Sequence, residues 1–245
     1  MKIRAYCPHI MRPHVMRTVL FFLTIPLFAQ NIFVGQWRLD TGGYYRFYTD
    51  GTGGVSESPE GDFIEDFSFL SWEGTGITPD YPRSNTLLLV SGSGNSLHDV
   101  TVKLYSYTYT ESGDTVRAQD GEGNQFVFTR IAGNPAPLDI RPHPLLRQWE
   151  ARWNGGNHGG SLGTWSFLYR PDGTIRAYHH RLHQFVNAYL VRGNVLVILG
   201  EWRFHPAFPV NVGGITVRGR DSVFVREAGG TTWDYRKKAR VVWKE

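Results

Sequence analysis

The stretch YRFYTDGT, residues 45–52, decides the fold, because it reads as one strand, a tight turn and the start of a second strand. Tyr45 and Phe47 alternate with polar neighbours, which is the period of a half-buried β-strand. Asp50-Gly51 is a favoured pair for a two-residue hairpin turn, which needs a positive φ at both central positions. The stretch therefore predicts an antiparallel hairpin.

The same pattern returns as FLYRPDGT at residues 167–174, and three further blocks repeat in the same order. The pairs are GQW (35–37) with RQW (147–149), NTLLLV (85–90) with NVLVIL (194–199), and residues 114–130 with 221–237, which end in FVFTR and WDYRK. Preserved order with drifting spacing is typical of a diverged tandem duplication. Between the copies, residues 132–144 carry four prolines and predict a stiff linker.

We therefore expect an all-β protein of two tandem, small, antiparallel up-and-down β-barrels. Turn residues punctuate each copy often enough for about seven or eight short strands. The expected domains are residues 31–131 and 145–245, joined by the linker at 132–144.

The first 30 residues predict an export signal. An apolar run from Val19 to Ala29 follows Arg12 and Arg17, and it is shorter than the roughly 20 apolar residues that span a bilayer. We expect cleavage near Ala29, no transmembrane helix, and a protein that is periplasmic, secreted or associated with the outer membrane. Cys7, the sole cysteine, precedes the run, so the mature chain would have neither a disulfide nor a catalytic thiol.

The charge of the chain divides unevenly between its parts. The net charge of +4 comes from the first 30 residues, so the mature chain is neutral and its charge does not argue for nucleic acid. Residues 31–133 hold 6 basic and 14 acidic groups, a net charge of −8, whereas residues 134–245 hold 16 and 8, a net charge of +8. The opposed charges predict either face-to-face docking of the two domains or an anionic envelope surface bound by the second domain.

Three motifs carry a resemblance to a known family. The Gly-x-Trp opening at 35–37, the hairpin at 45–53 and the closing strand at 126–130 resemble the lipocalin-like domains of exported bacterial proteins, within the calycin group of up-and-down barrels. The resemblance implies that an opening tryptophan packs across the closed end of each barrel, against a basic side chain of the last strand.

That implied pairing joins Trp37 with Arg130, and Trp149 with Lys237. A cation above the indole face gains a cation–π contact. The second copy departs from the family pattern, because Arg147 replaces the glycine of the opening motif and Lys237 stands where arginine is expected.

Candidate catalytic and metal-binding patterns are weak. GGSLG (159–163) has the spelling of a nucleophile elbow, but the next residues alternate as a strand instead of forming the required helix. His179 and His183 have the i, i+4 spacing of metal ligands on a helix, yet they also follow a strand pattern. The acids of residues 57–66 have the composition of a solvated loop. We expect no enzyme activity, no cofactor and no metal, with a weak Zn²⁺ or Cu²⁺ site at the two histidines as the alternative.

The functional prediction rests on aromatic residues that alternate along strands and so share one face of each strand. They are Tyr45, Phe47, Phe126, Phe128, Phe167, Tyr169, Trp233 and Tyr235. Inside a barrel they would either line a cavity for one small hydrophobic ligand or fill the core completely.

We therefore expect an exported, non-enzymatic protein that binds a small apolar ligand or a cell-envelope partner. The alternatives are a structural or interaction protein with filled cores and charged contact faces, and an outer-membrane β-barrel, whose strands would need about 9–11 residues.

Overall fold

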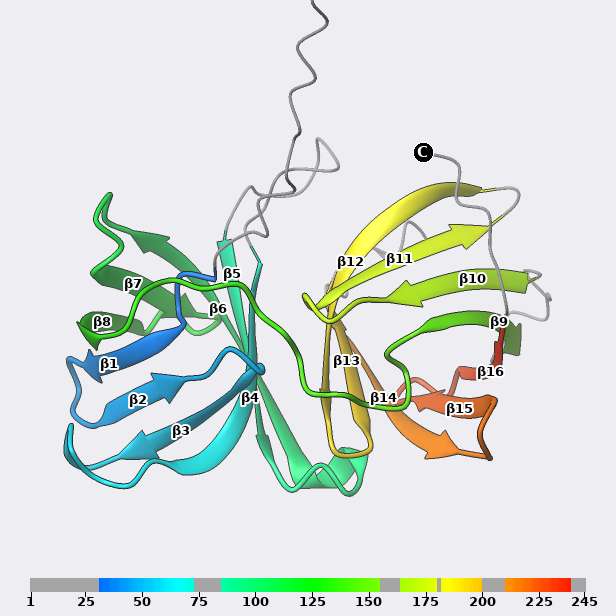
Figure 1. The fold of residues 1–245 in the computed structure, drawn as a ribbon, viewed down its shortest axis with the longest axis horizontal. Helices are drawn as coiled ribbons and strands as arrows, with labels where there is room; N and C mark the ends of the chain where they lie inside the picture. The colour runs from blue at the N-terminus through cyan, green and yellow to red at the C-terminus, as the bar shows by residue number, and fades with distance from the viewer. Residues whose placement is uncertain (1–30, 73–84, 155–163, 180–181, 200–209, 239–245) are drawn as a thin grey trace, which may run out of the picture.

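The computed structural model describes residues 31–72, 85–154, 164–179, 182–199 and 210–238, and these form two closed antiparallel barrels of eight strands each (Figure 1). The first barrel contains β1 (Gly35–Leu39), β2 (Tyr44–Phe47), β3 (Thr52–Ser56), β4 (Ile64–Trp72), β5 (Asn85–Gly92), β6 (Val100–Tyr109), β7 (Thr115–Asp120) and β8 (Gln125–Ala132). The second contains β9 (Gln148–Asn154), β10 (Thr164–Tyr169), β11 (Thr174–His179), β12 (Leu182–Arg192), β13 (Val195–Leu199), β14 (Val210–Val217), β15 (Ser222–Glu227) and β16 (Thr232–Lys237). A short 3₁₀ turn, η1 (Leu97–Asp99), precedes β6.

The order of the strands confirms the predicted all-β, tandem architecture. Each strand pairs with the next one along the chain, and the first strand of each barrel closes the sheet against the eighth. The repeated sequence blocks occupy equivalent strands, so that β5 of the first barrel corresponds to β13 of the second. This arrangement is consistent with a lipocalin-like fold.

The hairpin that decides the fold differs in detail from the predicted turn. Tyr48 N donates to Thr52 O at 2.8 Å, which leaves three residues in the loop instead of two. Only Gly51, at φ 79°, lies in the left-handed region, and Asp50 does not. The carboxylate of Asp50 instead accepts from Thr52 N and Oγ1, at 3.0 and 2.6 Å. Asp172 and Thr174 repeat this arrangement in the second barrel.

One end of the first barrel is closed by a tryptophan under an arginine. The guanidinium carbon of Arg130 lies 4.2 Å from the centroid of the Trp37 ring. The same guanidinium donates to Ile32 O at 2.6 Å and to Val34 O at 2.8 Å, so it also ties down the segment that enters β1. The indole of Trp37 donates to Phe33 O at 2.6 Å. A planar fork of donors can stack on a ring and bind carbonyls at once, which explains the arginine.

The second barrel corrects the expected pairing of Trp149 with Lys237. Lys237 lies opposite Trp149 in the register, but its ammonium forms an ion pair with Asp221 at 3.4 Å. Arg147 lies over the Trp149 ring instead, 5.5 Å from its centroid. A lysine ammonium lacks the planar fork that stacks and donates together, so the neighbouring arginine takes the stacking position. The indole of Trp149 donates to Leu145 O at 3.0 Å, as Trp37 does to Phe33.

The two barrels pack against each other through equivalent walls, β4–β6 and β12–β14 (Figure 1). Leu88 and Val90 of β5, both fully buried, belong to the same apolar cluster as Leu190 and Val197 of the second barrel. All five residues of β13 are buried, because one face looks into its own barrel and the other onto the first barrel. Each copy uses its fourth to sixth strands, so the interface is isologous.

Opposite charges meet at the edge of this interface. Arg192 of β12 donates to the backbone oxygens of Gly92 and Asp66 in the first barrel. Arg141 of the linker pairs with Asp50 at 2.6 Å and with Glu65 at 3.0 Å. The docking predicted from the charges of −8 and +8 is therefore present, although apolar side chains fill most of the contact.

The linker is bonded to both barrels by its backbone. Asp139 N donates to Thr49 O in the first barrel, and Ile140 N donates to Pro171 O in the second, both at 2.7 Å. At its end, His143 Nδ1 accepts from Leu145 N, while its Nε2 lies 3.1 Å from the hydroxyl of Tyr189. These bonds require a neutral imidazole, and burial lowers the pKa of His143 to about 4.

Acidification is therefore expected to destabilise the protein through His143. Its pKa is about 4 in the folded chain and about 6.5 when unfolded, so the unfolded state binds the extra proton between these values. The stability that neutral His143 contributes is present above pH 6.5 and is lost as the pH falls towards 4.

Urea unfolding at pH 7 and pH 4.5 measures this effect. Between these values the wild type should lose about 2 kcal/mol more than His143→Gln, whose amide can still donate to Tyr189 without titrating. Equal losses in the two proteins would show that His143 does not carry the acid sensitivity.

Candidate functional site

All eight aromatic residues predicted to line the interiors occupy inward positions of the two barrels. In the second barrel Phe167, Tyr169, Trp233 and Tyr235 are all buried. In the first barrel Phe47 and Phe128 are buried, whereas Tyr45 and Phe126 are only partly buried. The two interiors therefore differ in how far their aromatic side chains reach solvent.

The second barrel is filled by its own side chains. Trp165 stacks on Phe167 with the ring centroids 6.1 Å apart, and Trp233 meets Phe167 edge-on at 5.6 Å. The hydroxyls of Tyr169 and Tyr235 bond to each other at 3.0 Å, which satisfies two polar groups that are completely buried. The described residues of this interior line a cavity of about 10 Å³, which is about the least volume that holds one water.

The mouth of a barrel is taken as the end formed by its first, third, fifth and seventh connections. In the second barrel the first three of these lie outside the described residues, but one ring of described positions near this end shows how the strands themselves fill it. Gly213 lies opposite Glu227, and Val225 lies opposite Trp233. Trp233 Nε1 donates to the Glu227 carboxylate at 2.6 Å, which holds the indole across the barrel. A Cβ at Gly213 would lie 2.8 Å from Val225 Cγ1, so this space is fully used.

The same ring in the first barrel is partly open. Tyr105 lies opposite Asp120, and Ala118 lies opposite Phe126, in the register of the second barrel. Tyr105 and Phe126 are both partly buried, and their rings meet edge-on at 5.6 Å. Tyr45, from the opposite wall, contacts Phe128 edge-on at 5.8 Å. Aromatic side chains from three strands thus reach solvent at one mouth.

Asp120 does not bind a side chain of the next strand as Glu227 binds Trp233. Its carboxylate accepts from Glu122 N at 3.0 Å, Asn124 N at 2.9 Å and Asn124 Nδ2 at 2.9 Å, all within its own turn. These bonds, led by the one from the Asn124 side chain, lower the pKa of Asp120. The carboxylate therefore stays ionised at the rim. The Phe126 side chain has no N–H group that could donate to it, in contrast to the indole of Trp233.

The phenol groups at the mouth lie in a negative field. Burial raises the pKa of Tyr45, and the charge of Asp66 raises it further. Burial also raises the pKa of Tyr105, with smaller contributions from Tyr45 and Asp120. Both hydroxyls are therefore neutral donors at physiological pH, and two carboxylates lie near enough to act on them.

A hollow of about 610 Å³ lies on the β5–β8 wall of the first barrel. Asn85, Tyr107, Ala118 and Phe126 form one cross-strand row along it, and the flanking rows carry Ser106, Thr108, Arg117, Gln119, Gln125 and Val127. Grooves between two ladders of side chains are a general feature of sheet surfaces, and this one has a floor of paired backbone. It therefore identifies a ligand less directly than the converging aromatic rings of the mouth.

The predicted metal candidates lie on strands and not on a helix. His179 ends β11 and His183 belongs to β12, so the i, i+4 argument does not apply, and their side chains lie outside the described residues. The GGSLG motif at 159–163 also lies outside them. Among the residues that are described, no group of three or more His, Cys, Asp or Glu side chains is arranged to hold a metal ion.

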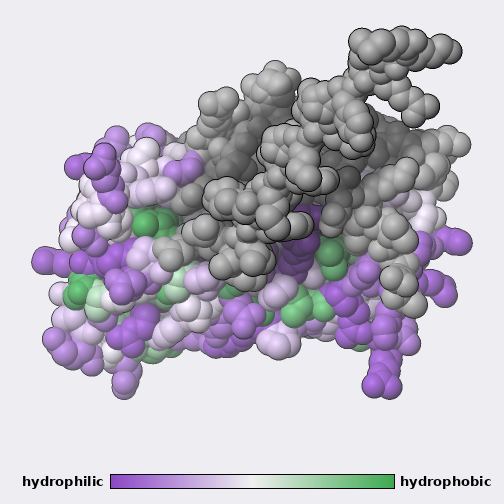
Figure 2. All heavy atoms as spheres, turned by 45° about the horizontal axis from the view of Figure 1, so that its top comes forward, coloured by the Kyte–Doolittle hydropathy of each residue, from purple (hydrophilic) through white to green (hydrophobic). Residues whose placement is uncertain are grey.

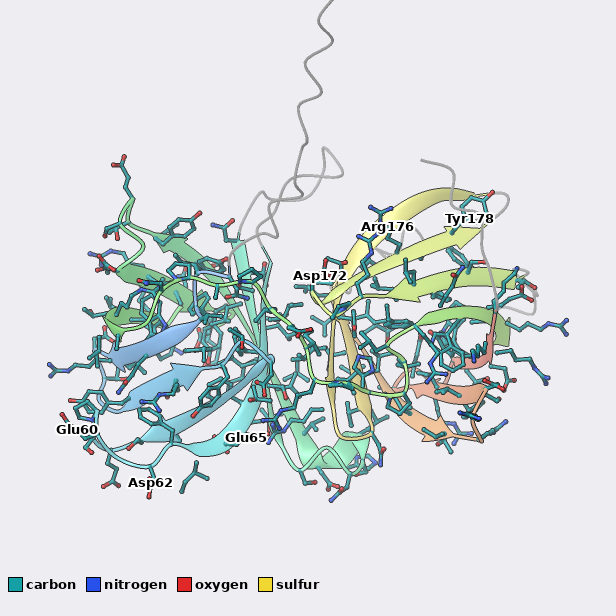
Figure 3. The ribbon with its side chains drawn as sticks, viewed as in Figure 1. Glu60, Asp62, Glu65, Asp172, Arg176 and Tyr178 are labelled. Atoms are coloured by element: carbon teal, nitrogen blue, oxygen red, sulfur yellow. The ribbon has the colours of Figure 1, made fainter. Side chains whose placement is uncertain are left out.

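The described residues form no large hydrophobic patch on the face shown in Figure 2, and the acidic residues before β4 lie at the mouth end. Figure 2 shows a mainly hydrophilic face with scattered hydrophobic spots, and exposed large apolar residues such as Ile64 and Val217 belong to different barrels. In Figure 3, Glu65 lies towards the second barrel, whereas Glu60 and Asp62 lie on the loop before β4, at the mouth end. In the described part of the chain, no helix has the length and apolar character needed to cross a membrane.

Sequence reasoning missed Tyr105 and Phe33. Tyr105 belongs to the alternating run YSYTY (105–109), which carries the same strand signal as the chosen aromatics. Phe33 precedes Trp37 by four residues, as Leu145 precedes Trp149, and this shared spacing marks both as part of the repeat. Comparison of the sequence with protein-family models and with curated proteins finds no match.

Proposed function

We propose that this chain is a non-enzymatic binding protein that takes one small ligand at the mouth of its first barrel. The observation that carries the proposal is the difference between two equivalent rings. Among the described residues, Trp233 and Glu227 fill this ring of the second barrel, whereas Tyr105, Phe126 and Tyr45 leave a partly exposed aromatic surface in the first. Barrel mouths are common ligand sites, and partly exposed aromatic rings offer a binding surface at low entropic cost.

The second barrel then has a supporting role. Its filled core and its large apolar contact with β4–β6 make it a rigid wall for the first barrel. Charged residues cover its free outer wall, where Arg152 lies opposite Asp234 and Arg236 lies opposite Glu150. This pattern supports a wall that faces water, because strands of a membrane barrel present apolar residues outward. Export, and an envelope partner at the second barrel, remain part of the proposal.

Binding of the neutral fluorescent probe N-phenyl-1-naphthylamine tests the proposal. Phe126→Trp introduces the residue that fills the second barrel, so the variant should bind the probe at least tenfold more weakly than the wild type. The matched change, Trp233→Phe, lies at the equivalent position of the second barrel and should leave the affinity of the first-barrel site for the probe unchanged. Native mass spectrometry of the purified chain would detect any retained ligand and give its mass.

Two results would contradict the proposal. A wild-type chain that does not raise the fluorescence of the probe has no accessible apolar site. A probe that binds Phe126→Trp and the wild type equally well, but not Trp233→Phe, would place the site in the second barrel.

A further inference from the structure

We infer that the mouth of the first barrel selects organic cations, in particular ammonium groups that carry apolar substituents. The inference rests on the proposed function and adds the chemical class of the ligand. Three kinds of observation support it: the cluster of partly exposed aromatic rings, the positions of the acids, and the state of the phenols.

The aromatic side chains come from different strands and lie close together at the mouth. Tyr45 lies on β2, Tyr105 on β6 and Phe126 on β8, and all three are partly exposed. Below them, Phe67 lies 6.2 Å from the Tyr45 ring and closes the apolar floor. Partly exposed aromatic rings that lie close together can attract a cation through their quadrupoles, and substituted ammonium groups lose little hydration on binding to them.

The topology brings the acids of the first copy to the same end. In an up-and-down barrel the first, third, fifth and seventh connections share one end. Three of these connections carry Asp40, then Glu57, Glu60 and Asp62, then Glu122 beside Asp120. Asp50 and Glu65 of the first copy lie at the interface, whereas these acids surround the mouth, where they attract cations from solution.

The immediate surroundings of the hydroxyls have the same sign. Asp66 and Asp120 act on Tyr45 and Tyr105 and favour their neutral forms, so a third negative charge would be repelled there. Lys103 shares the inward row, but it is exposed at the rim, where water and salt screen it. The acids on the surrounding connections therefore set the sign of the potential.

A pair of isosteric probes tests the class of ligand. Choline and 3,3-dimethylbutan-1-ol have nearly the same shape, but only choline is charged. Displacement of N-phenyl-1-naphthylamine from the full mature chain measures the affinity of the protein for each compound. Choline should displace the probe at concentrations at least tenfold lower than the alcohol, and this advantage should shrink when NaCl is raised from about 50 to 500 mM.

Two isosteric variants locate the charge. Asp66→Asn should weaken the binding of choline severalfold and leave the affinity for the alcohol unchanged. Glu111→Gln is a matched change on the β6–β7 turn at the closed end, and it should alter neither of these affinities.

Each outcome separates the two proposals. If the probe binds but the alcohol competes as well as choline, or neither competes, the cation class is wrong and the binding site stands. If the probe itself does not bind, the proposed function fails, and the inference fails with it.

Discussion

Leu88→Asp is expected to lower the free energy of unfolding by about 4 kcal/mol or more and to uncouple the two barrels. Leu88 is completely buried, and its side chain points out of the first barrel into the apolar cluster shared with Leu190. A carboxylate there would lose its water without gaining a partner, which is one of the most costly changes in a folded protein. Because the interior of the first barrel keeps all its side chains, each barrel should keep its own strands.

Urea denaturation followed by tryptophan fluorescence measures the loss, and small-angle scattering measures the separation. The wild type should unfold in one transition, and Leu88→Asp in two. Ile131→Asp introduces the same charge at an apolar residue of β8 that is 45% exposed, so it should cost less than about 1 kcal/mol. A Leu88→Asp chain as stable and compact as Ile131→Asp would show that the interface contributes little.

Phe33→Ala is expected to cost about 3–5 kcal/mol, as large truncations in aromatic cores do. Phe33 is completely buried and precedes the first strand, yet it contacts Trp37, Phe47, Tyr107 and Phe128. Its removal leaves a cavity that strands hydrogen-bonded around the whole barrel cannot collapse to fill. The backbone oxygen of Phe33, which accepts from Trp37, is kept in the variant.

Thermal and urea unfolding with Tyr109→Ala as the control isolate this contribution. Tyr109 is 43% exposed near the same end of the barrel, so its truncation should cost less than about 1 kcal/mol. A Phe33→Ala chain no less stable than Tyr109→Ala would mean that Phe33 does not close the barrel.

Much of the architecture could be predicted because it depends on local patterns. Alternating residues such as Tyr45 and Phe47 define strands, and the repeated blocks indicate two copies. The apolar runs within residues 85–90 and 194–199 also carry information about the tertiary structure. Unbroken apolar runs indicate strands buried on both faces, and these runs form the two strands at the centre of the interface.

Other features could not be predicted because they depend on which side chains meet. The turn at Asp50 has three residues because its carboxylate binds Thr52 and keeps the aspartate out of the left-handed region. Arg147 replaces Lys237 above Trp149 because a guanidinium can stack there while the ammonium pairs with Asp221. Neither choice follows from spacing along the chain.

The sequence by itself determined the strand periodicity, the duplication and the opposed charges of the two copies, because each is a property of neighbouring residues or of composition. Only the tertiary structure decided how completely the described side chains fill each mouth. Tyr105 and Gly213 occupy equivalent positions, but the space around each depends on side chains from other strands, Phe126 in one barrel and Trp233 with Glu227 in the other. The volume left inside a barrel is the sum of these distant choices, so the two copies differ at the mouth while sharing the same fold.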